Sequence, residues 1–367
     1  MSAVRGLGAL AAAVLLGLVV AAPAHADGVR NQQWYLSSMD LAAVHAINRG
    51  TGVMVAVVDS GVDASHPDLT GNVQPGTETA GTRDQDGRGT ALASLIAGHG
   101  HGANNADGVL GVAPGAAILP VAFAPRPGEI GDPAALAAGI DTAVSKGAKV
   151  ICIGRGVAPN VQLREAVESA LASDVVVVAA DGDVAGGSFS PWPSSIVGVL
   201  TSIALDRSGS ALVAPASRRT TGIGVPGVDM ISATAGGGYR VQTGATGAGL
   251  LCGAVALVRA QFPQLTADQA VDLLRTTATD KGSKGPDSLY GAGVLNLKAA
   301  LSVAPPSVSP SARPTAGTGG TVSNAGGGKA QASNVSLTES RDWRRWLVLL
   351  PLIGFLLALG AFATRRA

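Results

Sequence analysis

The sequence has 367 residues, with 26 basic against 25 acidic side chains and a formal net charge of +1. This balance gives no electrostatic reason to expect a nucleic-acid partner. The 51 glycines, the many alanines and valines and the few aromatic residues suit an α/β domain with short turns. The length allows one large domain or two ordinary ones, and we expect neither a metal nor a cofactor.

Residues 1–26 are typical of a secretory signal peptide. Arg5 supplies the positive charge near the start, and residues 7–22 form an uncharged apolar run. Small residues occupy the two positions before the end of the segment that a signal peptidase inspects, within Ala24-His25-Ala26. We therefore expect cleavage before Asp27 and export of the domain that follows. The alternative is an uncleaved anchor helix.

Between residues 27 and 302, short runs rich in valine and isoleucine alternate with alanine-rich stretches. This pattern predicts strands at residues 53–58, 118–122, 149–153 and 175–180, and helices at 90–98, 133–146 and 163–172. Apolar strands separated by helices indicate a parallel sheet with helices on both faces. In such sheets ligands bind at the carboxyl ends of the strands, and Asp59 and Asp183 follow two of these runs.

Two cysteines, Cys152 and Cys252, are too few for a disulfide scaffold. They could pair in an exported domain. Because nothing local brings residues so far apart in the sequence together, we expect two buried free thiols instead.

The end of the chain differs in composition from its middle. Residues 303–340 are dense in Pro, Ser, Thr, Gly and Ala without an apolar period, which predicts a disordered linker. Residues 346–363 then form an uncharged run of about 18 residues, at the lower limit for a transmembrane helix. The layout predicts a single-pass protein of the cell membrane, with the domain extracellular and residues 364–367 as a short cytoplasmic tail. A terminal helix buried in the core is the alternative.

Five motifs in the middle of the chain resemble those of the subtilisin-like serine proteases, the S8 peptidases. They are V-A-V-V-D-S-G-V-D-A-S-H-P-D-L at 55–69, D-G-R-G-T-A-L-A-S-L-I-A-G at 86–98, G-V-L-G-V-A-P-G-A-A-I-L-P-V at 108–121, V-P-G-V-D-M-I-S-A at 225–233 and G-A-V-A-L-V-R-A-Q-F-P-Q-L-T at 253–266. The aspartate, histidine and serine segments follow one another in the order found in subtilisin. The resemblance covers residues 32–301 and implies a subtilisin-like fold.

Within that family the chain is most similar to the mycosins, membrane-anchored proteases associated with type VII secretion. The similarity rests on Q-Q-W-Y-L at residues 32–36, on the short stretch between Asp27 and Asp59, and on the linker followed by a C-terminal span. It implies the membrane as one partner, and peptide segments or secretion-system membrane proteins as others.

The resemblance assigns Asp59 to the aspartate of a Ser-His-Asp triad, although Asp59 could also merely cap the turn that follows it. The histidine position holds Arg88, which cannot accept a proton at neutral pH. No histidine of the chain is expected to replace it. His99, for example, would lie further along the helix that Arg88 begins, about 16 Å away.

The serine position holds Ala245 in an alignment without gaps, or Thr246 if one residue is deleted, and we favour Ala245. Asp183 replaces the oxyanion asparagine, and a carboxylate has no proton to donate at neutral pH. Arg155 stands in the substrate cleft where the family has an apolar residue. These replacements predict a membrane-tethered extracellular pseudoprotease with a binding or scaffolding role. The alternative is an S8 serine endopeptidase with weak or relocated activity.

The replacements also suggest that charges compensate one another. We expect Arg88 to form a salt bridge with Asp59 and thereby to lower the pKa of that carboxyl. We expect Arg155 to do the same for Asp183.

Overall fold

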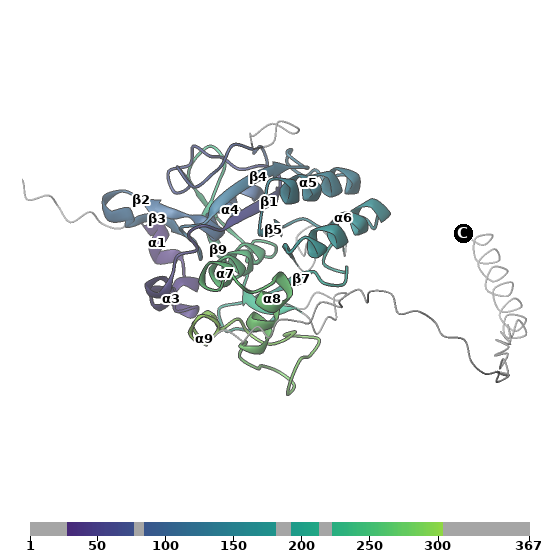
Figure 1. Cartoon of the computed structure of the whole chain (residues 1–367). Coiled ribbons are helices and arrows are strands. Elements are labelled where there is room, and N and C mark those ends of the chain that lie inside the picture. Colours follow the sequence, from purple (N-terminus) through teal and green to yellow (C-terminus); the bar gives the residue numbers. More distant parts are fainter. Residues whose placement is uncertain (1–27, 77–83, 181–191, 213–221, 304–367) are drawn as a thin grey trace, which may run out of the picture. The chain divides into compact units, whose positions relative to one another are not determined.

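The computed structural model describes residues 28–76, 84–180, 192–212 and 222–303 (Figure 1). The predicted signal peptide, Asp183, the linker and the predicted membrane span lie outside these residues. Within the described ranges, no helix combines the length and the apolar character needed to cross a membrane.

A six-stranded sheet forms the centre of the domain, in the order β4-β1-β5-β6-β7-β8. Its strands are β1 (Met54–Asp59), β4 (Ala117–Ala122), β5 (Val150–Ile153), β6 (Val176–Ala180), β7 (Leu200–Leu205) and β8 (Ile223–Pro226). Every neighbouring pair is parallel, and Val55 of β1 pairs with Ile118 on one side and Val150 on the other. The predicted parallel sheet is confirmed.

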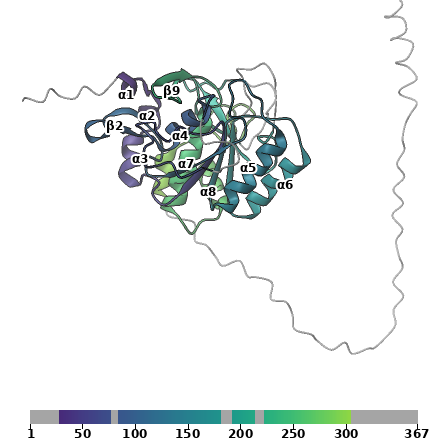
Figure 2. The ribbon, with the colours of Figure 1, turned by 90° about the horizontal axis from the view of Figure 1, so that it is seen from above.

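Helices cover both faces of this sheet, as predicted. The helices are α4 (Arg88–Ala97), α5 (Pro133–Ser145), α6 (Val161–Ala172) and α7 (Gly247–Gln261). Val55 and Val57 point into one apolar core with α4 and α7, whereas Ala56 and Val58 point into a second core with α5 and α6. Figure 2 shows α5 and α6 side by side, and they are in contact. Successive strand residues alternate between the faces, which explains why the strand sequences are apolar throughout.

The smaller elements surround this central sheet. They are α1 (Gly28–Gln32), α2 (Tyr35–Ser38), α3 (Leu41–Ile47), α8 (Ala267–Thr276), α9 (Leu297–Ser302), the 3-10 helix η1 (Ala103–Asn105), the β2–β3 pair (His99–His101 and Asp107–Leu110) and the β9–β10 pair (Met230–Ala233 and Tyr239–Gln242). Local sequence sets several boundaries. Asn160 caps α6 by accepting a hydrogen bond from the Leu163 amide at 3.1 Å, and Thr266 forms a capping box with Gln269 at the start of α8.

The helix predicted at residues 90–98 is α4, but it does not continue to His99. It ends at Ala97, and His99 begins strand β2. Gly98 allows the chain to leave the helix in a crowded place, because a Cβ there would lie 2.5 Å from the Ser94 carbonyl oxygen and 2.8 Å from that of Val109. The expectation that Arg88 and His99 share one helix is therefore wrong.

The expectation of free thiols is also wrong, because Cys152 and Cys252 form a disulfide. Cys152 lies in β5 and Cys252 in α7, which packs directly on that strand. The packing brings the two Cα atoms to 5.9 Å from each other although 100 residues separate them in the sequence. Both side chains are buried in the core beneath α7.

Candidate functional site

Asp59 is the last residue of β1, and its side chain is fully buried. Within the described residues, neither of its carboxylate oxygens accepts a hydrogen bond. Its main-chain oxygen is well bound, with the Phe123 amide at 2.9 Å. Gly154, just after β5, leaves room for the carboxylate, since a Cβ there would lie 2.9 Å from Oδ2 of Asp59. The carboxylate is thus held by packing and by charge alone.

Arg88 begins α4 and points at this carboxylate. Its Nε lies 3.6 Å from Oδ1 of Asp59, and its side chain is 16% exposed. The expected meeting of the two side chains within salt-bridge distance is confirmed, although 3.6 Å is too long for a hydrogen bond. The next residue must be small: a Cβ on Gly89 would lie 1.9 Å from the carbonyl oxygen of Gly61, in the loop after β1. This close approach fixes Arg88 beside Asp59.

The expected lowering of the Asp59 pKa is wrong. Burial raises the pKa of this carboxyl from its ordinary 3.8 to about 7, and Arg88 offsets only part of that effect. Asp84 and Asp86 raise the pKa further through their negative charges. Desolvation prevails because Arg88 attracts the carboxylate without donating a hydrogen bond to it, and the backbone of Ser60 favours the charged form only slightly.

Arg155 follows β5 and is almost fully buried. Its Nη2 donates a hydrogen bond of 2.8 Å to Oδ2 of Asp86, and the same oxygen lies 3.5 Å from Nη2 of Arg88. Asp59, Arg88, Asp86 and Arg155 therefore form one chain of alternating charges. We expected Arg155 to pair with Asp183, which lies outside the described residues, whereas its partner within them is Asp86.

Asp84 and Asp86 are the site residues that the sequence reasoning missed. Oδ1 of Asp84 accepts a hydrogen bond from the Gly87 amide at 2.7 Å, and Oδ2 accepts from the amide and the hydroxyl of Thr90 at 2.9 and 2.7 Å. Asp84 thus binds the free amides at the start of α4. Its negative charge also offsets the unfavourable interaction between the Arg88 cation and the helix N-terminus. The available signal was a pair of aspartates directly before a predicted helix.

The two candidates for the serine position lie at the start of α7. Thr246 is the residue before the helix; its side chain is buried, and its hydroxyl has no hydrogen-bond partner within the described residues. Ala245 is half-buried. No hydrogen bond links Thr246 to Asp59 or Arg88, so the structure leaves both alignments open. Gly249 lets α7 approach α4, since a Cβ there would lie 3.1 Å from the Leu92 carbonyl oxygen.

The histidines within the described residues are bound elsewhere. Their ring nitrogens contact main-chain or side-chain oxygens as follows: His45 to Val112 at 2.9 Å, His66 to Gly238 at 3.2 Å, His99 to Thr70 at 2.9 Å, and His101 to Asp68 at 2.6 Å. None of them hydrogen-bonds to Asp59. The part of the chain that the structure describes also contains no group of three His, Cys, Asp or Glu side chains that could hold a metal ion. Arg88 cannot accept a proton at neutral pH, so a hydroxyl at the start of α7 has no proton acceptor at that position.

The sequence matches one protein family and several known proteins. Residues 50–293 match the Subtilase family, Peptidase_S8. Fervidolysin of Fervidobacterium pennivorans is 33% identical over 324 residues, which cover 78% of this chain and 46% of fervidolysin, so the chain spans about half the length of that relative. Subtilisin Savinase of Lederbergia lenta is 34% identical over 278 residues, which cover 73% of this chain and 97% of Savinase.

Solved structures agree with the sequence relatives. The crystal structure of fervidolysin, described as a keratinolytic enzyme related to subtilisin, matches with a TM-score of 0.65 and 30% identity over 76% of this chain and 48% of that one. The Prenylagaramide maturation protease PagA matches with a TM-score of 0.62 and 25% identity over 71% of this chain and 96% of PagA. By its sequence and by its fold, this chain belongs to the subtilase family.

Proposed function

We propose that this chain is a membrane-tethered extracellular pseudoprotease, a subtilase-family domain that binds a protein partner without cleaving it. One observation carries the proposal: Arg88, an obligate cation, lies 3.6 Å from Asp59, where the family mechanism needs an imidazole. A guanidinium has no lone pair to accept the proton of a nucleophile at neutral pH. The site has therefore lost its general base.

The other replacements support the same proposal. If Ala245 is the serine equivalent, the nucleophile is missing too, and Asp183 could not donate a hydrogen bond to an oxyanion. In subtilisin, loss of the serine or of the histidine alone lowers turnover about 10⁶-fold. Proteolysis by the family mechanism is accordingly not expected.

An active-site probe tests this proposal. The purified full-length chain should not be labelled by a fluorophosphonate, and it should not hydrolyse casein or fluorogenic peptides faster than a Thr246→Ala control. Subtilisin, run in parallel, shows that the probe and the substrates work. Labelling that disappears in the Thr246→Ala variant would contradict the proposal and would identify a surviving nucleophile.

The second candidate function is an S8 endopeptidase with weak or relocated activity. It is favoured by the unpartnered hydroxyl of Thr246 at the start of α7, and by relatives whose names describe proteases. A Thr246→Ser variant distinguishes the two functions. An acting nucleophile should keep its activity or gain some in this variant, whereas the pseudoprotease should remain inactive. Activity that Thr246→Ser preserves and Thr246→Ala abolishes would establish the endopeptidase.

The proposed location is the outer side of the cell membrane. The predicted signal peptide and C-terminal span support it, and the Cys152–Cys252 disulfide fits an oxidising compartment. The full-length chain should remain in salt-washed membranes, and truncation after Ser302 should release the domain. Recovery of the full-length chain in the cytosol would contradict this location.

We also propose that the partner belongs to a type VII secretion complex. The support is the resemblance of residues 32–36 and of the overall layout to the mycosins. Membrane complexes purified through the full-length chain should be enriched in secretion-system membrane proteins, compared with a control purified through an unrelated single-pass protein. Equal recovery in the two preparations would contradict this partner.

A further inference from the structure

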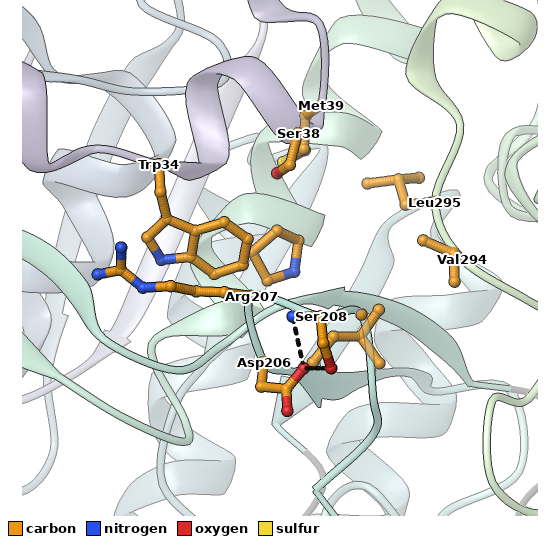
Figure 3. A pocket seen from close by; sticks show the side chains of 11 residues that line it. Trp34, Ser38, Met39, Asp206, Arg207, Ser208, Val294 and Leu295 are labelled. Carbon is orange, nitrogen blue, oxygen red and sulfur yellow. Dashed lines mark hydrogen bonds between the residues drawn. The ribbon is translucent and has the colours of Figure 1, made fainter.

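A pocket of about 220 Å³ lies where the N-terminal helices meet the carboxyl ends of β7 and β8 (Figure 3). Its apolar lining residues are Trp34, Met39, Leu205, Pro226, Val294 and Leu295. The residues around Asp59 do not line it, so it is a second site. Its volume is suited to one large apolar side chain and not to an extended ligand.

Trp34 provides a fixed wall of this pocket. Its indole nitrogen donates a hydrogen bond of 3.1 Å to the carbonyl oxygen of Val228, which satisfies the polar atom of the ring and sets the plane of the indole. The ring itself is only half-buried and borders the pocket (Figure 3). An aromatic surface that is already oriented costs a ligand little ordering entropy.

Arg207 places a positive charge at the rim. Its guanidinium carbon lies 5.7 Å from the centre of the Trp34 ring, and its Nε lies 3.5 Å from Oδ2 of Asp229. The side chain is 59% exposed. Apart from the ion pair with Asp229, its guanidinium has no hydrogen bond to another described residue. Arg207 is thus held by a cation–π contact and by one weak ion pair, and its terminal nitrogens can bind a carboxylate through two hydrogen bonds.

Asp206, the acidic residue that lines the pocket, accepts hydrogen bonds within its own turn. Oδ1 of Asp206 accepts hydrogen bonds from the amides of Ser208 and Ser210, both at 2.8 Å, and from the Ser208 hydroxyl at 2.6 Å. The carboxylate thereby closes its own turn, as the dashed lines of Figure 3 show for Ser208. Arg207 is the cationic group of the lining, and it is the one that the carboxylate of a ligand can engage.

We propose that this pocket binds a segment of a partner protein in which one large apolar side chain is followed directly by glutamate or aspartate. The apolar side chain fills the space beside Trp34 and Leu295, and the carboxylate pairs with Arg207. Because the pocket is separate from Asp59 and Arg88, this binding is independent of whether the chain cleaves its partner. The inference thus goes beyond the proposed function and can fail separately from it.

Fluorescence anisotropy with short peptides tests the chemistry of the ligand. The probes are fluorescein-labelled hexapeptides that differ only in their central pair: Phe-Glu, Phe-Lys and Ala-Glu. The full-length chain in detergent should bind the Phe-Glu peptide roughly 10-fold more tightly than either of the other two. Equal affinities, or no binding of the Phe-Glu peptide at millimolar concentration, would overturn the proposal.

Three variants assign the binding to this pocket. Arg207→Glu should reverse the preference in favour of the Phe-Lys peptide, which a loss of folding could not produce. Ser38→Phe should fill the pocket and abolish binding; Ser38 is exposed, so the folded domain tolerates the change. Arg126→Glu is the matched control, because Arg126 is 75% exposed, pairs with Glu129 at 3.8 Å and does not line the pocket.

The same variants exclude other occupants. If Arg207→Glu leaves the peptide preference unchanged while Arg126→Glu alters it, the binding site lies elsewhere and the proposal is wrong. If the chain forms a dimer in sedimentation experiments and Ser38→Phe abolishes that dimer, the occupant is a second copy of this chain. That outcome would also overturn the proposal.

Discussion

Replacing Asp59 with asparagine should change how the stability of the domain depends on pH. The folded state raises the pKa of this carboxyl to about 7, so between its ordinary value of 3.8 and about 7 the folded state binds a proton that the unfolded state has released. The contribution to stability is therefore complete below pH 3.8 and is lost as the pH rises through about 7. Asparagine cannot ionise and removes this dependence.

The size of the effect follows from the two pKa values. A rise from 3.8 to about 7 corresponds to about 4 kcal/mol of stability lost well above pH 7, of which about 2–3 kcal/mol is lost between pH 5 and pH 8. The buried amide of asparagine carries its own desolvation cost of about 1–3 kcal/mol, but this cost is the same at every pH. The parent should accordingly lose about 2–3 kcal/mol relative to Asp59→Asn over that interval.

Urea unfolding monitored by circular dichroism at pH 5, 6, 7 and 8 measures this difference. Taking the parent minus the variant at each pH cancels the contributions of titrating groups that do not interact with Asp59. Asp141→Asn serves as the matched control, because Asp141 is exposed on α5 and the chemical change is the same. Parent and Asp59→Asn curves that run parallel from pH 5 to pH 8 would refute the reasoning, and so would a difference of opposite sign.

Three further predictions concern the surroundings of this carboxylate and the core. Arg88→Ala should destabilise the domain more at pH 8 than at pH 5, because it removes the nearest cation from the buried carboxylate; equal losses at the two pH values in urea titrations would speak against this. Gly89→Ala should prevent α4 from packing against the loop after β1, since its Cβ would lie 1.9 Å from the Gly61 carbonyl oxygen. Expression and a melting temperature equal to those of the parent would contradict that expectation. The double variant Cys152→Ala, Cys252→Ala should lose about 2–5 kcal/mol of stability, and an unchanged urea midpoint would show that the disulfide contributes nothing.

Local patterns in the sequence were enough to predict the central strands. The run at residues 53–58 is apolar throughout because β1 is buried on both faces, and the observed strand differs from the prediction by one residue at each end. The motifs around Asp59 and Arg88 likewise predicted that these two side chains meet. Both inferences depend on interactions between residues close in sequence or on a resemblance across the whole domain.

Other features depend on three-dimensional detail that no pattern contains. Strand β7 was not predicted, because its sequence L-T-S-I-A-L mixes polar and apolar residues. The disulfide requires α7 to cross β5, which brings together residues 100 positions apart. The direction of the Asp59 pKa depends on complete burial of the carboxyl, which no local pattern states: at 3.6 Å Arg88 attracts the carboxylate without donating a hydrogen bond, and burial prevails.

The Cys152–Cys252 bond also determines how the domain can respond when Asp59 gains or loses its proton. It joins the strand that leads to Arg155 to the helix that begins after Thr246, so these two elements cannot separate or slide while the bond is intact. Arg88 and Arg155 both approach Oδ2 of Asp86, at 3.5 and 2.8 Å, and these side chains can rearrange while the bonded strand and helix stay together. Side-chain rearrangements take picoseconds to nanoseconds, whereas displacement of packed helices takes microseconds to milliseconds. The response of these side chains to a change of pH should therefore be fast, and β5 and α7 should keep their relative position during it.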